Sequence, residues 1–268
     1  MCELLAVSMS HEARLTFSLH TLAQRGAPTG AAHDGWGVAF YQGKDVALYR
    51  EPGPAGDSPL VRFLESGGPP TQLAISHIRH ATQGGIQLAN TQPFVRELAG
   101  RSHVFAHNGN LPGIERRAAL ALGSYRPIGD TDSEHAFCAL MERLKALWPD
   151  AGTPALQARL DLLARFAADL RELGPANFLY ADGDAVFAHG HRRIQRATGR
   201  IEPPGMWMLQ RHCPPAGLPP QSRGGVSIAD GERTAVWFAS VPLTAEDWRP
   251  LAEGELVAVR GGEILAGA

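Results

Sequence analysis

The chain has 268 residues, of which 44% are hydrophobic, and 25 Lys and Arg against 27 Asp and Glu give a formal net charge of -2. This length suits one large domain or two small ones, with enough apolar residues for a sizeable core. The near-neutral charge leaves no electrostatic basis for nucleic acid as a partner.

The cysteines and the hydropathy pattern indicate the cellular compartment. Cys2, Cys138 and Cys213 are an odd number without CxxC spacing, which argues against a disulfide framework or a zinc ribbon and favours a reducing compartment. The apolar stretch 4–9 is too short for a signal-peptide core. No apolar run approaches the roughly 20 residues that cross a bilayer. We therefore expect a cytoplasmic protein with no membrane partner.

Short apolar, β-branched or aromatic runs predict a first set of strands at 4–8, 37–41, 46–49, 73–78 and 103–107. A later set of strands is predicted at 178–181, 185–188, 235–240 and 256–259. Between the two sets, apolar residues at helical spacing predict two long helices, at about 132–148 and 154–173. Shorter helices are expected at 15–24 and 59–64. The Pro- and Gly-rich stretch 203–225 is expected to be a long surface excursion that contains a short strand at 206–209.

The order of strands, helix pair and strands excludes a regular doubly wound βαβ sheet. It predicts an α+β fold, in which two mostly antiparallel sheets stack with helices outside. No internal repeat or low-complexity linker divides the chain, so we expect a single domain over residues 1–268.

Cys2 directly follows Met1. Removal of Met1 would put a thiol and a free α-amine on one residue, so a nucleophile and its general base would need no separate histidine. The amine has an ordinary pKa of about 7.7–8.0 and the thiol one of about 8.5, close enough for proton transfer near neutral pH. A free cysteine is usually a small buried hydrophobe, so Cys2 alone carries little weight.

Three other segments hold the chemistry that an amide-cleaving cysteine requires. In segment 107–110, a tight turn with Gly109 at positive φ would aim the Asn108 amide and the Gly109 N–H at one oxyanion. Arg79 follows a predicted strand, and its guanidinium could hold a carboxylate. Asp132 lies at a predicted helix start and could pair with an ammonium group. Each segment also has a structural reading, as a common turn, an ion-pair partner or a helix cap.

Histidines give a weaker indication of a metal site. His103 and His107 would share one face of a strand but stand about 13 Å apart. No Cys or Asp cluster completes a tetrahedral ligand set. We therefore expect neither a metal nor a cofactor. The arginines Arg192, Arg193 and Arg196 are expected on a solvated surface.

Six motifs follow one another along the chain: Met1-Cys2, Gln24-Arg25-Gly26, Asp34-Gly35-Trp36-Gly37, His77-Ile78-Arg79-His80-Ala81-Thr82, His107-Asn108-Gly109 and Thr131-Asp132-Ser133-Glu134. In content and order they resemble the class II glutamine amidotransferases, which are N-terminal nucleophile hydrolases. Segment 34–41 resembles a branch of stand-alone domains of the YafJ type and related γ-glutamyl amide hydrolases. The resemblance extends to about Ser240.

The resemblance implies a four-layer αββα sandwich in which Cys2 is the nucleophile. It implies that Asn108 and Gly109 form the oxyanion hole. It also assigns three residues to the zwitterionic end of the substrate: Arg79 and Thr82 to the α-carboxylate, and Asp132 to the α-amine. Arg25 matches a family arginine near the nucleophile, and its role stays open.

Two features depart from the synthase-linked members of the family. Gln83 stands where a histidine usually follows the threonine, and no second domain that would receive ammonia is expected. The expected function is hydrolysis of glutamine or of a larger γ-glutamyl amide, releasing glutamate and ammonia or an amine. The ammonia would be released or passed to a separate synthase. The alternative is a glutamyl-ligand-binding or scaffold subunit that is active only with a partner synthase.

Overall fold

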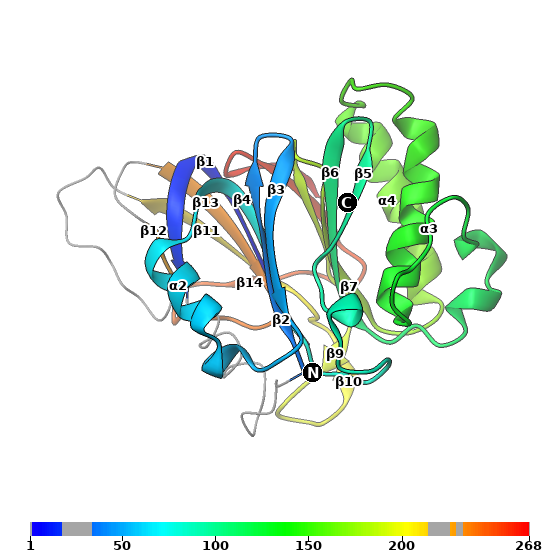
Figure 1. The fold of residues 1–268 in the computed structure, drawn as a ribbon, viewed down its shortest axis with the longest axis horizontal. Helices are drawn as coiled ribbons and strands as arrows, with labels where there is room; N and C mark the ends of the chain where they lie inside the picture. The colour runs from blue at the N-terminus through cyan, green and yellow to red at the C-terminus, as the bar shows by residue number, and fades with distance from the viewer. Residues whose placement is uncertain (1, 18–33, 214–225, 229–232, 268) are drawn as a thin grey trace.

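The computed structural model describes residues 2–17, 34–213, 226–228 and 233–267. Two β-sheets lie face to face, with one helix outside the first sheet and two helices outside the second (Figure 1). This confirms the α+β class and the expected four-layer αββα sandwich of the N-terminal nucleophile hydrolases. The helices are α2 (Pro59–Gly67), α3 (Asp132–Leu147) and α4 (Leu156–Arg171), with short 3-10 turns at Ala55–Asp57, Leu88–Asn90, Ile114–Arg116 and Ala118–Leu120.

The first sheet carries the N-terminus of the described chain in its central strand. Its order is β14-β11-β13-β1-β4-β2-β3, and β12 pairs with the far end of β1. All of these pairings are antiparallel. The strands are β1 (Glu3–Phe17), β2 (Trp36–Gln42), β3 (Asp45–Glu51), β4 (Pro70–Ile78), β11 (Trp207–Cys213), β12 (Val226–Ile228), β13 (Arg233–Ala239) and β14 (Arg249–Pro250).

The second sheet has the order β16-β15-β8-β7-β6-β5, again with antiparallel neighbours. Its strands are β5 (Phe94–Leu98), β6 (Arg101–Gly109), β7 (Ala176–Ala181), β8 (Val186–His189), β15 (Leu256–Arg260) and β16 (Glu263–Gly267). A separate two-stranded ribbon, β9 (Arg193–Ile194) and β10 (Ile201–Glu202), lies near the start of β1 (Figure 1).

Side-chain alternation along the strands explains the layers, since successive residues of a strand face opposite sides of a sheet. In β1, Leu5 and Val7 pack toward α2, whereas Leu4 and Ala6 pack between the two sheets. In β7, Phe178 faces the α3/α4 layer and Leu179 faces the space between the sheets. Both sheets are therefore apolar on both faces, as a four-layer sandwich requires.

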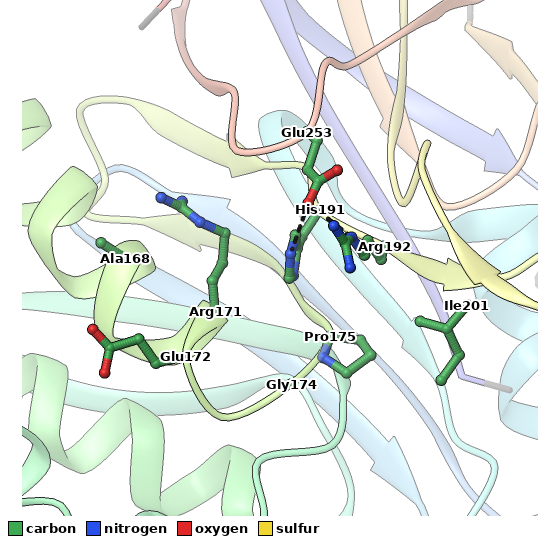
Figure 2. Close-up of a pocket in the computed structure, with 9 residues that line it drawn as sticks. All are labelled: Ala168, Arg171, Glu172, Gly174, Pro175, His191, Arg192, Ile201 and Glu253. Carbon is green, nitrogen blue, oxygen red and sulfur yellow. Dashed lines mark hydrogen bonds and ion pairs between the residues drawn. The ribbon is translucent and has the colours of Figure 1, made fainter.

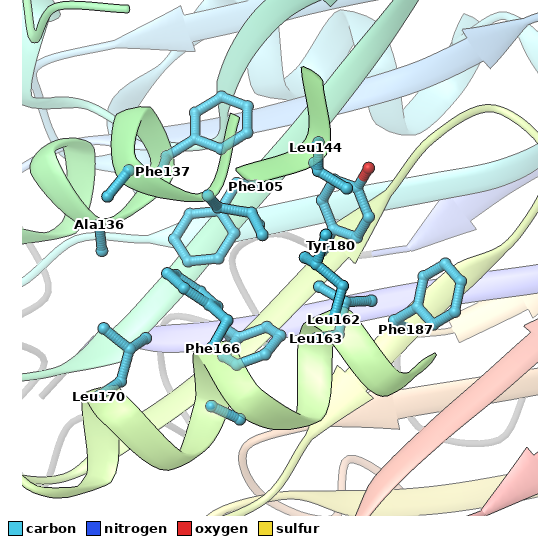
Figure 3. Close-up of a cluster of buried hydrophobic side chains, with 14 of the residues drawn as sticks. Phe105, Ala136, Phe137, Leu144, Leu162, Leu163, Phe166, Leu170, Tyr180 and Phe187 are labelled. Atoms are coloured by element: carbon cyan, nitrogen blue, oxygen red, sulfur yellow. The ribbon is translucent and has the colours of Figure 1, made fainter. Parts of the chain in front are cut away.

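Aromatic rings join β6 to the helices outside the second sheet (Figure 3). The ring of Phe105 in β6 stacks on that of Phe137 in α3, with centroids 5.3 Å apart, and meets that of Phe166 in α4 edge-on. Such aromatic pairs add about 0.5–1.5 kcal/mol to the burial of their surface. They anchor the strand whose last residues are Asn108 and Gly109.

Two expected elements are wrong. Residues 15–17 of the expected helix 15–24 end strand β1, where Ala13 and Leu15 are buried and Arg14 is exposed, an alternation that a short run cannot distinguish from a helix. Residues 18–24 lie outside the described residues. The short strand expected at 206–209 is confirmed as β11, which extends to Cys213. Because β11 pairs with β13 on one side and with β14 on the other, this part of the stretch is not a surface excursion. Residues 214–225 also lie outside the described range.

The start of β1 is held by a buried ion pair. Both Glu3 and Arg193 are below 5% exposed, and the Arg193 guanidinium donates to both Glu3 carboxylate oxygens, at 2.7 and 3.1 Å. Leu4 exchanges hydrogen bonds with Ser240 at the end of β13. The expectation that Arg193 lies on a solvated surface is therefore wrong, because its charge is neutralised inside the protein by a residue 190 positions away.

Replacing Glu3 by glutamine should lower the free energy of unfolding by about 3 kcal/mol, because the substitution leaves the Arg193 guanidinium buried without a counter-charge. Chemical denaturation would measure the change. Glu12→Gln is the matched control, since Glu12 is exposed on the same strand, and it should change the stability by less than about 0.5 kcal/mol. Equal denaturation midpoints for the two variants would show that the buried pair does not stabilise the start of β1.

Candidate active site

The thiol of Cys2 lies between the main-chain groups of residue 80. Because β1 and β4 run antiparallel with Glu3 opposite Ile78, the chain that leaves β4 passes beside the residue that precedes β1. The Cys2 Sγ donates to the His80 carbonyl oxygen at 3.3 Å and accepts from the His80 N–H at 3.2 Å. Burial raises the pKa of the Cys2 thiol above its ordinary value, and the His80 N–H acts in the opposite direction.

Asn108 reaches Cys2 from the opposite sheet. It is near the end of β6, on the face that also carries Val104 and Ala106 toward the space between the sheets. Its side-chain Nδ2 donates to the Cys2 carbonyl oxygen at 2.6 Å. A carboxamide has two N–H donors, so this bond leaves a second donor on a residue that lines the same cavity as Cys2. The geometry suits an amide that stabilises negative charge next to the sulfur.

Gly109 is extended and paired with Ala176 of β7, so the tight turn with positive φ that the sequence predicts here is wrong. The reason for a glycine is steric. A Cβ at this position would overlap the Pro175 carbonyl oxygen and crowd the His107 ring. Gly109 therefore allows two chain segments to approach beside the thiol, a requirement that no turn pattern reveals.

Arg79 is buried at 3% exposure and holds its own loop. Its guanidinium donates to the carbonyl oxygens of Gln83, Gly84 and Gly85, at 2.9 to 3.1 Å, and to that of Asp34 at 3.3 Å. The Asp34 carboxylate in turn accepts from the Ala81 N–H at 2.7 Å. This network fixes the loop whose Thr82 and Gln83 face the thiol.

Asp132 begins α3, where the Thr131 side chain accepts from the Glu134 N–H as an N-cap. The Asp132 carboxylate accepts from the Leu111 N–H at 2.7 Å and from the Ser133 hydroxyl at 3.3 Å. The helix start is thus tied to the segment that follows β6. Asp132 is half-buried, and both of these hydrogen-bond donors are groups of the protein itself.

A cavity of about 390 Å³ opens at Cys2, within the ~300–1,000 Å³ range of small-molecule sites. It brings together four of the six predicted site residues, Cys2, Thr82, Asn108 and Gly109. Arg79 and Asp132 do not line the cavity, but they hydrogen-bond to two segments that do, residues 82–83 and 110–111. Contact of Arg79 and Asp132 with a substrate stays a prediction. The remaining lining residues are His80, Gln83, Asn110, Pro175, Arg192, Arg193, Ile194 and Ile201.

Asn177, which is fully buried in β7, is a functional residue that the sequence does not predict. Its Nδ2 donates to the carbonyl oxygens of Asn108 and Arg192, at 3.1 and 2.8 Å, and its Oδ1 accepts from the His191 N–H at 2.8 Å. The Asn177 side chain therefore joins the strand that carries Asn108 to the segment that carries Arg192 and Arg193. An asparagine within a strand gives no signal of this role in the sequence.

Buried histidines in β4 and β6 are neutral, with His77 and His107 near the ends of their strands and His103 near the start of β6. Burial lowers the pKa of His77 to about 3 and that of His103 to about 4. His103 contacts the Tyr180 hydroxyl, and His107 contacts the Ser133 hydroxyl. Over the part of the chain that the structure describes, no group of three or more His, Cys, Asp or Glu side chains is arranged to hold a metal ion.

The family model of the class II glutamine amidotransferases matches residues 1–268. The chain belongs to this family. The match continues beyond Ser240, where the sequence resemblance was expected to end. The family motif at Arg25 lies outside the described residues.

Two relatives match most of this class II glutamine amidotransferase domain. The chain is 39% identical over 201 residues to YafJ of Escherichia coli (strain K12), which covers 75% of this chain and 77% of YafJ. It is similar, with 31% identity and a TM-score of 0.73, to the crystal structure of a predicted glutamine amidotransferase from Pseudomonas aeruginosa PA01. That similarity covers 98% of this chain and 99% of the other.

A more distant likeness shows the fold alone. The glutamine phosphoribosylpyrophosphate amidotransferase of B. subtilis has 17% identity and a TM-score of 0.58, and the similarity covers 99% of this chain. This chain spans about half of that enzyme, since only 48% of it is covered. Among the helices described in this amidotransferase domain, none is long and apolar enough to cross a membrane.

Replacing Gly109 by alanine should lower the free energy of unfolding by about 1–3 kcal/mol, because the added methyl group must displace Pro175 or the end of β6. Thermal unfolding would measure the change. Gly53→Ala is the control, since its Cβ would meet no atom within 4 Å, and it should cause no loss of stability. If both variants unfold at the same temperature, Gly109 is not required for the close approach.

Proposed function

We propose that this single-domain protein hydrolyses glutamine or a related γ-glutamyl amide through a thioester on Cys2. The observation that supports this most directly is that one cavity holds the Cys2 thiol beside an Asn108 amide whose orientation is already set. Membership of the class II glutamine amidotransferases supports the same reaction. The products are glutamate and ammonia, or glutamate and an amine.

The reaction begins after removal of Met1. The α-amine of Cys2 takes the thiol proton, and the thiolate attacks the γ-carbonyl carbon of the substrate. The second N–H of the Asn108 amide and the Gly109 N–H stabilise the oxyanion, and such a donor is worth about 3–4 kcal/mol. The Cys2 ammonium returns the proton to the amide nitrogen, and the C–N bond breaks. Water then attacks the thioester carbon, which releases glutamate and restores the thiol.

The loop of Arg79 is proposed to hold the zwitterionic end of the substrate. Thr82 and Gln83 face the cavity directly. The Arg79 guanidinium would bind the α-carboxylate by exchanging some of its bonds to the carbonyl groups of the loop. Asp132 would likewise accept the α-amine beside the Leu111 N–H. These exchanges would make binding of the glutamyl group coincide with a rearrangement of residues 82–85.

The alternative function is a glutamyl-ligand-binding or scaffold subunit that acts only with a partner synthase. The engagement of the Arg79 guanidinium by its own loop favours this alternative, since a partner that moves the loop would free the guanidinium. Turnover by the isolated protein separates the two functions. Glutamyl-ligand binding without turnover would favour the subunit.

Cys2→Ala should lower the rate of glutamate release from glutamine by about 10⁴-fold, because it removes the nucleophile. An irreversible glutamine analogue should alkylate the wild-type protein on Cys2. Cys138→Ala is the matched control and should retain activity within about twofold, because Cys138 lies buried in α3 and burial raises the pKa of its thiol to about 11. Full hydrolytic activity in Cys2→Ala would sink the proposal.

Retention of Met1 should abolish turnover and shift the pH dependence of Cys2 alkylation. With Met1 present, burial holds the Cys2 pKa above its ordinary value, so the alkylation rate by iodoacetamide should rise only above the range of a free thiol, about 8.5. After Met1 is removed, the positive charge of the adjacent ammonium group should lower the pKa of the Cys2 thiol and move this midpoint to lower pH. Mass spectrometry that finds Met1 retained in fully active protein would contradict the role of the amine as base.

A further inference from the structure

A second cavity adjoins the one at Cys2. It has a volume of about 460 Å³ and lies between the end of α4, residues 174–175 and the segment 191–192 (Figure 2). Three residues, Pro175, Arg192 and Ile201, line both cavities. The two cavities therefore share a wall, and a molecule longer than glutamine could extend from Cys2 into the second one.

Both carboxylates that line the second cavity already have cationic partners. Glu172 pairs with Arg117 at 2.5 Å, and Glu253 pairs with Arg192 at 2.7 Å. The Glu253 carboxylate also lies 3.4 Å from the His191 Nε2 (Figure 2). Glu172 is therefore balanced by Arg117, which does not line the cavity, and Glu253 is balanced by Arg192, which does.

The His191 ring is neutral in this arrangement. Its Nδ1 accepts from the Ala176 N–H at 3.3 Å, so the proton is on Nε2, which faces Glu253. Burial lowers the pKa of His191, against the opposing effect of Glu253. His191 thus lines the second cavity as an uncharged side chain.

Arg171 is the other cationic side chain that lines the second cavity, and neither Glu172 nor Glu253 pairs with it. It is the last residue of α4, and its guanidinium contacts the His189 Nε2 at 3.3 Å. The His189 Nδ1 donates to the Glu255 carbonyl oxygen at 3.1 Å, so Nε2 is an acceptor and the ring is neutral. Over residues 2–17, 34–213, 226–228 and 233–267, no carboxylate is within ion-pair distance of Arg171. The dipole at the C-terminus of α4 stabilises the positive charge of Arg171. The dipole does not provide a hydrogen-bond acceptor for the other N–H groups of the Arg171 guanidinium.

The position of the glutamyl group sets the direction of the leaving group. Thr82 and Gln83, from the loop of Arg79, line the cavity at Cys2. Thr82 and Gln83 do not line the second cavity, whereas Pro175, Arg192 and Ile201 line both cavities. An amide whose glutamyl end faces Thr82 therefore directs the group on its nitrogen toward the shared wall.

We propose that the second cavity binds a carboxylate on the leaving amine, so that the preferred substrate class is γ-glutamyl amides of amino acids. This inference rests on the proposed function. The Arg171 guanidinium forms charge-assisted hydrogen bonds to the carboxylate. The exposed side chain of Ile201, in the shared wall, covers the apolar part of the leaving amine. Hydrolysis cleaves the amide C–N bond, adds the elements of water and releases glutamate and a free amino acid.

Steady-state hydrolysis of γ-glutamylglycine and of γ-glutamylglycinamide by the processed protein tests this proposal, because the two substrates differ mainly in the charge of the distal group. The wild-type protein should show a kcat/KM about tenfold higher for γ-glutamylglycine. Arg171→Gln should remove this preference and leave glutamine hydrolysis within twofold of wild type. Arg171→Lys, which keeps the charge, should retain part of the preference.

Arg165→Gln is the matched control, since it removes the same charge from an exposed position of the same helix. It should keep the wild-type preference. Equal cleavage of the two substrates by the wild-type protein, or an unchanged preference in Arg171→Gln, would overturn the proposed carboxylate site.

Calorimetric binding to Cys2→Ala separates failure of this inference from failure of the proposed function. If the wild-type protein cleaves no γ-glutamyl amide, the proposed function is wrong. The affinities of Cys2→Ala for the two compounds would still show whether the second cavity binds a carboxylate. Cys2→Ala should bind γ-glutamylglycine about tenfold more tightly than γ-glutamylglycinamide, and the additional change Arg171→Gln should equalise the two affinities. Equal affinities without that change would reject the carboxylate site.

Discussion

The buried ion pair between Glu3 and Arg193 is the constraint on which the site depends. Glu3 is the residue after the proposed nucleophile, and Arg193 begins the ribbon that lines both cavities. Burying two charges costs several kcal/mol per ion unless the geometry is excellent. The bidentate contact, together with the bond from Arg193 to the Ser240 carbonyl oxygen, supplies that geometry. The central strand of the first sheet and the wall of the substrate cavity are thereby fixed relative to each other.

The polar groups proposed to act on substrate are already engaged by the main chain. The Asn108 amide donates to the Cys2 carbonyl oxygen, the Arg79 guanidinium to the carbonyl groups of its loop, and the Leu111 N–H to the Asp132 carboxylate. The bond from Asn108 fixes the orientation of its amide beside Cys2, whereas the bonds of Arg79 hold residues 83–85 in the loop. In the proposed binding mode the bonds of Arg79 and Asp132 are partly exchanged, so the affinity for a glutamyl group would be the difference between two sets of hydrogen bonds.

Much of the architecture could be predicted from periodicity. The long helices α3 and α4 and most strands were located from apolar spacing, since these elements bury a regular face. The expected helix at 15–24 was wrong over residues 15–17, because a short apolar run fits either period. Ordered motifs predicted that Cys2, Thr82, Asn108 and Gly109 would meet. The roles of Arg193 and Asn177 could not be predicted, because their partners are distant in sequence and meet only after the sheets have stacked.

Asn177 also limits which substitutions the two cavities can accept independently. Its carboxamide joins the main chain at Asn108 to the main chain at His191 and Arg192, so the reacting centre and the second cavity share one rigid backbone frame. A drift of either segment would have to be matched by the other, at the cost of a buried polar group without a partner. Substitution of side chains that line the second cavity, such as Arg171 and Ile201, would leave this backbone frame intact, whereas substitution of Asn177 would disturb both cavities at once.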